Sequence, residues 1–374
     1  MPDPIPLVNL SRQVRGIQAE LREALRRVLQ SGTFILGPEV RCLEQEFARF
    51  CGRRFAVGVA SGTDALELAL RALGIGPGDW VATVSLTFVA TVDALHHVGA
   101  CPLFVDIDPA TYTMDPADLE AKVNSLTAGM RRRLKAILPV HLYGHPCDMD
   151  RIGAIARKVG VPVLEDAAQA AGAKWKGRPV GGLSELAAFS FFPTKNLGAY
   201  GDAGMVVTDS LQHARQLQML RVHGREANGM QVRLGRNSRL DELQAAILRV
   251  KIRRLRRWVD QRRRLAAAYN RLLSKIPGII CPVVQQGARH AYHLYTIRVS
   301  NRQRLQKVLR RQGIGFGLYY PTPVHLQPLS LRCFGRVHLP ETERAARQVI
   351  SLPVFPELRM EELQRVCKAV RSVF

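Results

Sequence analysis

Residues 187–210 read AAFSFFPTKNLGAYGDAGMVVTDS and place one lysine, Lys195, in a glycine-bearing loop between two apolar segments. The segments ELAAFSFF and AGMVVTD are apolar on successive residues, which is typical of strands covered on both faces. The first strand is expected to end at Ser190, five residues before Lys195. Because ligands gather at the carboxyl ends of strands in open parallel sheets, Lys195 is a candidate for chemistry.

The same kind of apolar segment recurs along the first two thirds of the chain. Five more segments predict strands: RFAVGVA, DWVATVS, CPLFVDID, LKAILPV and VPVLED. Helical patterns separate several of them, over residues 64–73, 89–97 and 149–159. Strands that alternate with helices predict an α/β fold. We expect a large domain with a mostly parallel seven-stranded sheet flanked by helices.

From Arg239 the pattern becomes that of a long helix. Its apolar side chains recur at intervals of three and four residues and form one face: Leu240, Leu243, Ile247 and Val250. The strand-like segment HLYTIRVS, a helical pattern around residues 302–312 and the segment GLYYPTPVHLQPLS follow, and they indicate a smaller C-terminal α+β domain. We therefore predict a large domain of residues 1–250 and a small domain of residues 251–374, joined within one helix.

The chain is strongly basic, with a formal net charge of +23 over 374 residues. The charge concentrates in RRRLK at residues 131–135 and in RVKIRRLRRWVDQRRR at residues 249–264. A basic helix can bind nucleic acid or an anionic surface, although such runs are usually solvated helix faces. Only Trp258 interrupts the arginines as a possible stacking platform, so we do not expect nucleic acid as a partner. A basic binding or regulatory protein stays open as an alternative.

The cysteine pattern and the N-terminal residues bear on the compartment. Seven cysteines are scattered singly without a CxxC pair, which predicts reduced thiols in a reducing compartment. The segment HPCD at residues 145–148 fits no standard zinc spacing, so no metal is expected. The start MPDPIPLVNLSRQ lacks the features of a signal peptide, and no apolar run could span a membrane. These features predict a cytoplasmic protein.

Two other predicted strand ends carry unusual residues. In VGVASGTDAL a strand leads through Gly62 and Thr63 into a helix, where backbone amides and a hydroxyl can hold a phosphate. An ordinary helix capped by Thr63 or Asp64 is the alternative. In VPVLEDAAQ, Asp166 stands at the mouth of a buried strand, where a carboxylate needs a cation or hydrogen-bond donors. It could pair with a protonated ring nitrogen or cap a following helix.

A lysine held where its neutral amine is favoured can form a Schiff base with a carbonyl, including the aldehyde of pyridoxal 5'-phosphate. A phosphate site, a carboxylate for a ring nitrogen and Lys195 occur together in this order. Each signal is modest alone. Their combination predicts a site for pyridoxal phosphate.

The motifs SGTDAL, TFVAT, EDAAQAAGA, SFFPTKNLGAYGDAG, NSRLDELQAAIL, YYPTPVHLQ and SLPVFP follow one another along nearly the whole chain. On these motifs the chain resembles the pyridoxal-phosphate-dependent nucleotide-sugar aminotransferases of the DegT/StrS family, which have the aspartate aminotransferase fold (fold type I). The resemblance implies transfer of an amino group from an amino acid, with glutamate as the expected donor, to a nucleotide-linked keto sugar, with pyridoxamine phosphate as the intermediate carrier. The product would be an amino sugar for glycan or natural-product biosynthesis.

The resemblance also implies roles for individual residues in the cofactor site. Lys195 would form the Schiff base and shuttle a proton, and Asp166 would pair with the pyridine nitrogen. Gln169 would contact the ring hydroxyl and Phe88 would stack on the ring. The phosphate would be held by Gly62, Thr63, Ser190 and, from a second subunit, Asn237. The family thus implies a homodimer with shared active sites.

For the substrate, the resemblance places Arg239 near an anionic group. Tyr320 and His325 lie in a segment that would face the substrate, although packing or a loop hydrogen bond explains them equally well. Family members that aminate 4-keto sugars often have GEGG after the lysine, whereas this chain has GDAG at residues 201–204, as in the 3-keto branch. We therefore expect a 3-keto sugar, with a 4-keto sugar as the alternative.

Overall fold

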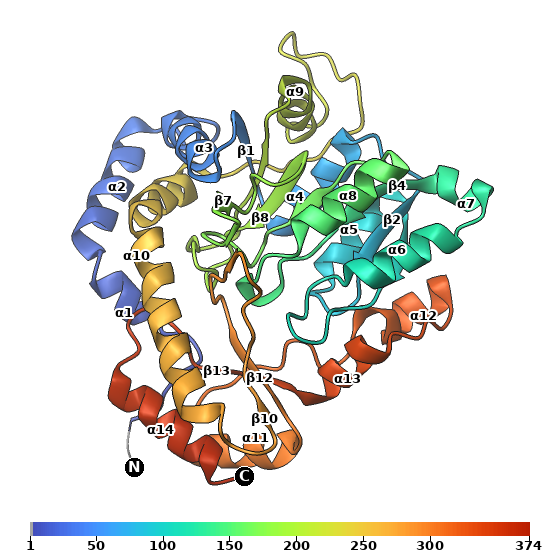
Figure 1. The fold of residues 1–374 in the computed structure, drawn as a ribbon. Helices are drawn as coiled ribbons and strands as arrows, with labels where there is room; N and C mark the ends of the chain where they lie inside the picture. Colours follow the sequence, from blue (N-terminus) through green and yellow to red (C-terminus); the bar gives the residue numbers. More distant parts are fainter. Residues whose placement is uncertain (1–2) are drawn as a thin grey trace.

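The computed structural model describes residues 3–374, and β-strands occupy its centre (Figure 1). They form a four-stranded sheet of order β1-β9-β8-β5 and a three-stranded sheet of order β3-β2-β4. Their bounds are β1 Phe55–Val59, β2 Trp80–Val84, β3 Cys101–Val105, β4 Leu134–Leu138, β5 Leu164–Asp166, β8 Leu186–Ser190 and β9 Gly204–Thr208. Every predicted strand of this region is confirmed. The pairing is mostly parallel, because only β9 runs antiparallel to its neighbours.

The prediction of one continuous seven-stranded sheet is wrong, because the ladder breaks between β4 and β5. Isolated parallel bridges alone join these edges, between Ile137 and Val163 and between Val140 and Asp166. Pro139 and Pro162 stand at this seam and have no backbone N–H to donate. They serve only as acceptors, Pro139 O from Asp166 N at 2.9 Å and Pro162 O from Ile137 N at 3.0 Å. The two sheets therefore meet edge to edge through an incomplete ladder.

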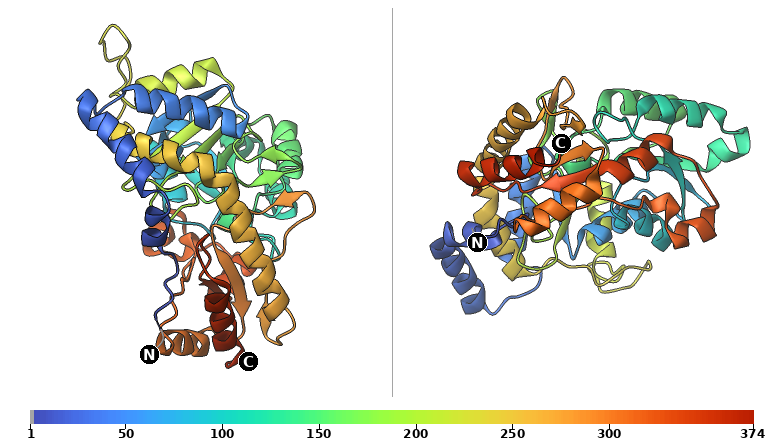
Figure 2. Two further views of the ribbon diagram at one scale, coloured as in Figure 1. Left: turned by 90° about the vertical axis from the view of Figure 1, so that its left-hand side faces the viewer. Right: turned by 90° about the horizontal axis from the view of Figure 1, so that it is seen from below.

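Helices cover both faces of these sheets (Figures 1 and 2). In the four-stranded sheet, Val57, Leu186 and Val206 share a core with helices α4, α5 and α9. Their strand neighbours point to the other face and pack against α3 and α10. The helices flanking the sheets are α3 Pro38–Cys51, α4 Gly62–Ala72, α5 Ala90–Val98, α6 Pro116–Ser125, α8 Met149–Val159, α9 Leu211–Leu220 and α10 Glu242–Leu273. The predicted helices of this region are confirmed.

The long helix α10 contributes residues to two hydrophobic cores, and its course can be followed in Figure 2. Its residues up to Val259 pack with the large sheet or with α2 Gln18–Ser31. From Leu265 onward they pack with a small antiparallel sheet of order β10-β12-β13. The remaining α-helices and strands are α1 Leu10–Arg15, α7 Ala128–Arg133, β6 Lys174–Trp175, β7 Arg178–Pro179, β10 Ile279–Ile280, β11 Ala288–Arg289, β12 Tyr295–Val299, α11 Arg302–Arg311, α12 Pro328–Phe334, α13 Pro340–Gln348, β13 Val349–Leu352 and α14 Met360–Arg371.

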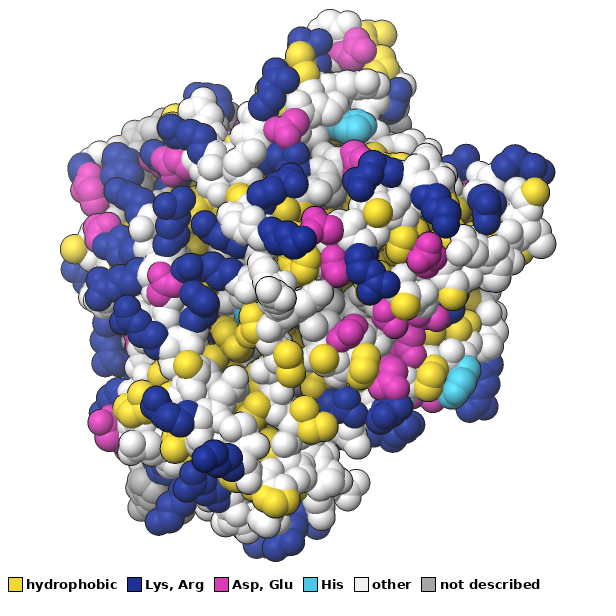
Figure 3. Space-filling model, in the orientation of Figure 1, with side chains coloured by type: hydrophobic (Ala, Val, Ile, Leu, Met, Phe, Trp, Pro, Cys, Tyr) yellow, Lys and Arg dark blue, Asp and Glu magenta, His cyan; other side chains and the backbone are white. Residues whose placement is uncertain are grey.

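Basic side chains are dense over α2, α3 and α10, on the left of Figure 3. Several of them are paired with acids and join these helices to one another. Arg249 of α10 contacts Glu39 at 2.7 Å and Glu46 at 2.8 Å, both on α3, and Arg254 pairs with Glu20 on α2. Part of the basic run therefore belongs to the packing of the fold. Among residues 3–374, no helix is both long and apolar enough to cross a membrane.

Candidate active site

A pocket of about 670 Å³ lies where β5 and β8 end and α4 begins. Eight of the eleven predicted site residues line it: Gly62, Thr63, Phe88, Asp166, Gln169, Ser190, Lys195 and Tyr320. They come from five separate segments of the chain. The three strand ends singled out in the sequence therefore converge on one cavity, as expected for the carboxyl edge of a sheet.

Asp166 is the last residue of β5 and is 4% exposed. Its Oδ2 accepts a hydrogen bond from the Thr91 hydroxyl at 2.8 Å, and its Oδ1 accepts one from the Ala168 N–H at 3.1 Å. Both donors are uncharged, and burial raises the pKa of Asp166. Turns follow β5, so the alternative in which Asp166 caps a helix is wrong. A cation in the pocket would compensate the buried carboxylate.

Lys195 occupies a tight turn after β8, half-buried at the pocket wall. Its N–H donates to the Phe192 carbonyl at 2.9 Å, and the Ala199 N–H donates to the Phe191 carbonyl at 2.7 Å. Burial lowers the pKa of Lys195 to about 8, while the negative charge of Asp166 opposes that shift. The ammonium group therefore loses its proton more readily than a lysine in water, as a nucleophilic amine requires.

The start of α4 lies against the end of β8 at the pocket. A Cβ added to Gly62 would lie 2.5 Å from the Cβ of Ser190, so only glycine allows this approach. Ser61 is the N-cap and its hydroxyl accepts a hydrogen bond from the Asp64 N–H at 3.1 Å, so the cap is neither Thr63 nor Asp64. The first turn of the eleven-residue helix α4 thus faces the pocket beside the Ser190 hydroxyl, an arrangement suited to a phosphate.

Two aromatic rings bound the pocket near Asp166. Phe88 is 55% exposed, and its ring centroid lies 6.0 Å from that of Tyr320 at an interplanar angle of 37°. Gln169 accepts a hydrogen bond from the Tyr143 N–H at 2.7 Å, which orients its amide group. That amide donates to the Tyr320 hydroxyl at 3.2 Å. Gln169 and Tyr320 therefore form one polar wall of the cavity.

Three predicted site residues do not line the pocket. Asn237 is exposed and Arg239 half-buried, both on the segment before α10. His325 is 1% exposed, with its Nδ1 2.6 Å from the Ser85 hydroxyl and its Nε2 3.6 Å from Glu343. The packing and hydrogen-bonding interpretation therefore describes the contacts of His325 within one chain. Its role toward the substrate stays a prediction.

The pocket also contains residues that the sequence interpretation missed. Thr91, within the quoted motif TFVAT, could have been found as a hydroxyl near a buried carboxylate. His293 lines the cavity from the segment before β12, and burial holds its pKa well below the usual range. Leu7 and Val8 close the cavity from the N-terminal segment. No local pattern signals these last three, because distant segments bring them in.

The residues of the cavity fit pyridoxal phosphate. A glycine cradle at a helix start suits the phosphate, and a buried carboxylate with only neutral donors suits a protonated ring nitrogen. Lys195, with its lowered pKa, suits the aldehyde. The phosphate, the ring nitrogen and the aldehyde of the cofactor would therefore each find a suitable group in the cavity.

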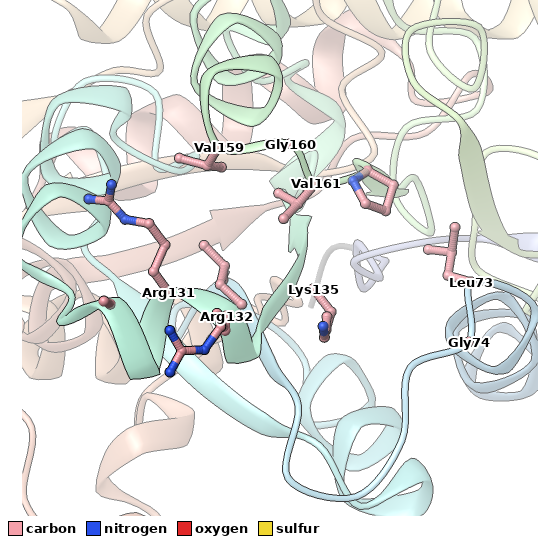
Figure 4. A pocket seen from close by; sticks show the side chains of 11 residues that line it. Leu73, Gly74, Arg131, Arg132, Lys135, Val159, Gly160 and Val161 are labelled. Atoms are coloured by element: carbon pink, nitrogen blue, oxygen red, sulfur yellow. The ribbon is translucent and has the colours of Figure 1, made fainter.

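A second cavity of about 660 Å³ lies far from this chemistry, at the surface beside α7 (Figure 4). Arg131, Arg132 and Lys135 of the basic segment line it, together with apolar side chains such as Val159 and Val161. Its lining includes none of the predicted site residues. We therefore assign no chemistry to this cavity.

Comparison with known proteins identifies the family of the chain. Residues 15–371 match the model of the DegT/DnrJ/EryC1/StrS aminotransferase family. A "pleiotropic regulatory protein" of Geobacillus stearothermophilus is 46% identical over 99% of this chain and 98% of its own length. A dTDP-3-amino-3,4,6-trideoxy-alpha-D-glucose transaminase of Streptomyces venezuelae is 44% identical over 98% of this chain and 96% of its own length. A UDP-N-acetyl-3-dehydro-alpha-D-glucosamine 3-aminotransferase of Acidithiobacillus ferrooxidans is 44% identical over 98% of this chain and 97% of its own length.

Two solved structures share the fold. DesV of S. venezuelae, solved in complex with a ketimine intermediate, matches with a TM-score of 0.94 and 43% identity, over 99% of this chain and 98% of DesV. NtdA of Bacillus subtilis, solved with bound cofactor PMP, matches with a TM-score of 0.90 and 31% identity, over 100% of this chain and 86% of NtdA. The chain belongs to the DegT/DnrJ/EryC1/StrS aminotransferase family. The family predicted from the motifs, and with it the aminotransferase class, is confirmed.

Proposed function

We propose that this protein transfers an amino group from glutamate to a nucleotide-linked 3-keto sugar, with pyridoxal phosphate as cofactor. The observation that carries the proposal is that Lys195 and Asp166 line the same cavity. A lysine with a lowered pKa and a buried carboxylate are the two charged groups that this chemistry requires.

When bound, pyridoxal phosphate supplies an electron sink and a carrier for the amino group. Within the chain, the Nζ of Lys195 holds and moves the proton at the reacting carbon. Asp166 stabilises positive charge at the ring position, in an orientation that its bonds from Thr91 and Ala168 hold fixed. Gly62, Thr63 and Ser190 would bind the phosphate, Gln169 would contact the ring hydroxyl, and Phe88 would pack on the ring; all five line the cavity.

The names of the relatives support a 3-keto sugar. Two relatives at 44% identity carry names that place the amino group at carbon 3 of a dTDP- or UDP-linked sugar. The GDAG sequence after Lys195 favours the same branch. The basic surface would attract a nucleotide diphosphate, with Arg239 near an anionic group of the substrate. We retain Tyr320 as a substrate contact because it lines the cavity.

The proposal includes a homodimer with shared sites. Asn237 is exposed and lies outside the cavity of its own chain, so it is free to reach the phosphate site of a second copy. The loop after α9, which precedes Asn237, projects from the body (Figure 1). It exposes Met230 by 64% and Leu234 by 77%. Exposed apolar side chains of this size are typical of protein contacts.

The boundary between the domains near Val250 and the cytoplasmic location remain predictions.

The first experiment is the visible absorption spectrum of the protein with pyridoxal phosphate, before and after addition of glutamate. We expect a visible band that glutamate bleaches and that the Lys195→Ala variant lacks. Isotope-labelled glutamate is then supplied together with dTDP- and UDP-linked 3-keto and 4-keto sugars. Mass spectrometry of the sugar product identifies which of them accepts the label. A band without bleaching would exclude glutamate as donor, and no band would exclude the enzyme function.

Two other functions are the alternatives to this proposal. A 4-keto sugar as acceptor would change the substrate and leave the cofactor site as described. A basic regulatory protein is suggested by the name of the relative from G. stearothermophilus and by the charge of +23. The presence of Lys195, Asp166 and Gln169 in one cavity speaks against it. Salt-dependent binding of nucleic acid by a protein that gives no cofactor band would favour the regulator.

A further inference from the structure

A second lysine is buried close to the loop that carries Lys195. Lys251 lies in the third turn of α10 and is 0% exposed, which makes it one of the largest fully buried side chains of the chain. Lysine is rarely buried completely unless its ammonium group finds partners. The surroundings of this side chain therefore need an explanation.

The ammonium group of Lys251 contacts the loop after Lys195 at two points. Its Nζ donates a hydrogen bond to the carbonyl oxygen of Gly198. The same nitrogen lies 4.6 Å from the centroid of the Tyr200 ring, within the range of a cation–π interaction. Both partners lie within five residues of Lys195.

Gln244 supports the same loop from the same helix. It precedes Lys251 by seven residues, two turns of α10, so both side chains share one helix face. Its Oε1 accepts a hydrogen bond from the Tyr200 N–H at 2.8 Å, and its Nε2 lies 3.4 Å from the Tyr200 carbonyl oxygen. One face of α10 therefore holds the backbone at residues 198 and 200.

The loop transmits this constraint to Lys195 because it is closed on itself. The Ala199 N–H donates to the Phe191 carbonyl at 2.7 Å, so the two ends of the turn are joined around Lys195. A Cβ on Gly198 would lie 2.2 Å from the Pro193 carbonyl oxygen, which shows how closely the turn folds back. A shift of the Gly198 carbonyl would therefore move the backbone that carries the reactive amine.

An apolar side chain would fill this space at a lower desolvation cost. Burial lowers the pKa of Lys251 to about 7, and the charge of Glu357 opposes the shift. A site selected for packing alone would favour leucine or methionine, which carry no desolvation penalty. The lysine is therefore better explained by the carbonyl and the ring that its ammonium group holds.

We propose that Lys251 is a positioning residue for Lys195: from the buried face of α10 it holds the Gly198 carbonyl and the Tyr200 ring, and so fixes the turn that presents the reactive amine. The inference rests on the proposed role of Lys195 as the amine that captures the cofactor aldehyde. Lys251 itself contacts neither cofactor nor substrate.

The test compares covalent with non-covalent cofactor binding in the Lys251→Met variant of the full chain. Capture of pyridoxal phosphate by Lys195 is followed by the visible band and fixed by borohydride reduction. We expect the capture rate to fall about tenfold, because small displacements of a reacting group are costly. Affinity for pyridoxamine phosphate, which makes no covalent bond to Lys195, should stay within about twofold of the parent. In turnover, kcat should fall about as much as the capture rate, with KM nearly unchanged.

Two further variants keep the inference testable. Leu255→Ala removes a fully buried apolar side chain on the same helix, and should lower the thermal midpoint while leaving the capture rate unchanged. Gln244→Leu removes the second attachment of the loop, and should slow capture about threefold. It decides the question if Lys251→Met does not fold.

Capture by Lys251→Met at the parental rate would overturn the inference. So would a loss of pyridoxamine phosphate affinity equal to the loss of capture rate, because that pattern indicates general damage to the site. If Lys251→Met does not fold, a parental capture rate in Gln244→Leu overturns it. A parent protein that never captures pyridoxal phosphate at Lys195 would instead refute the proposed function, and the inference with it.

Discussion

Thr91 donates a hydrogen bond from its hydroxyl to Oδ2 of Asp166 at 2.8 Å, and the Thr87 hydroxyl lies 2.8 Å from that of Thr91. All three side chains are buried. The chain of hydroxyls therefore begins on the segment after β2 and ends at the carboxylate of β5. This chain of hydroxyls fixes the orientation of the Asp166 carboxylate. The neighbouring acid, Glu165, takes no part in it.

Glu165 and Asp166 are adjacent acids with opposite environments. Glu165 points away from the cavity, where it lies 3.0 Å from His141 Nε2 and accepts hydrogen bonds from the N–H groups of Gly181 and Leu183 at 2.9 and 3.0 Å. Asp166 lines the cavity. The alternation of side chains along β5 thus separates a structural acid from the proposed functional one.

The first prediction uses this contrast. Asp166→Ala should lower kcat about 10³-fold and leave the thermal midpoint nearly unchanged, because it removes a buried carboxylate that only neutral donors satisfy. Glu165→Gln should do the opposite, with a lower midpoint and retained kcat in the folded protein, because its bonds hold residues 181–184. Turnover and thermal unfolding of both variants check this. Near-normal turnover in a well-folded Asp166→Ala protein would refute the assignment.

The second prediction concerns the pH at which the cofactor is captured. Only the neutral amine attacks an aldehyde, and burial lowers the pKa of Lys195 to about 8. The capture rate of the cofactor-free protein should therefore rise as the pH increases through about 8 and then level off. Asp166 raises the pKa of Lys195, so Asp166→Asn should move this profile to lower pH. Stopped-flow absorbance measures both profiles, and a midpoint near that of free lysine would contradict the prediction.

The third prediction tests the shared site. Lys195→Ala and Asn237→Ala should each be inactive as homodimers. When the two are refolded together, half of the dimers should be mixed, and each mixed dimer should have one intact site. Activity should thus return to about one quarter of the parental value. The control mixes Lys195→Ala with Asp166→Ala. Lys195 and Asp166 lie in the same cavity of one chain, so each site of a mixed dimer lacks one of them. No activity should return in this control.

If the refolded mixture of Lys195→Ala and Asn237→Ala forms dimers by light scattering but recovers no activity, Asn237 lies outside the site. A monomer of full activity would remove the shared site altogether. Either result leaves the assignment of Lys195 and Asp166 intact, because those residues share one chain.

Much of the fold could be predicted because short apolar segments of the sequence indicate buried strands. All seven central strands were found in this way. Their continuity was not, because it depends on which edges meet, and Pro139 matters only once β5 lies beside β4. Lys195 and Asp166 could be selected as candidates because strand ends mark ligand sites, and the family resemblance then implied their proposed roles. His293 and Lys251 could not be identified, because their contacts join segments about 50 or more residues apart.

The last prediction concerns how the N-terminal segment is fixed over the cavity. Leu7 and Val8 line the cavity, and Arg12, one turn further along, makes two hydrogen bonds to Glu362 of α14 at 2.7 and 2.6 Å. Hydrogen bonding to Arg12 lowers the pKa of Glu362 from 4.5 to about 2. The carboxylate therefore stabilises the folded state fully above pH 4.5 and loses this effect as the pH falls through about 2.

Glu362→Gln should therefore lower the free energy of unfolding by about 2 kcal/mol at neutral pH, the value typical of hydrogen bonds to a charged group. The difference from the parent should shrink as the pH falls from 4.5 towards 2, because the parental carboxylate then takes up its proton. Glu23→Gln is the control, because Glu23 pairs with Arg26 at 2.8 Å on the surface and is half exposed. It should change stability little at any pH. Thermal unfolding across this pH range measures both variants. A stability difference for Glu362→Gln that does not depend on pH would show that charge does not hold the N-terminal segment in place.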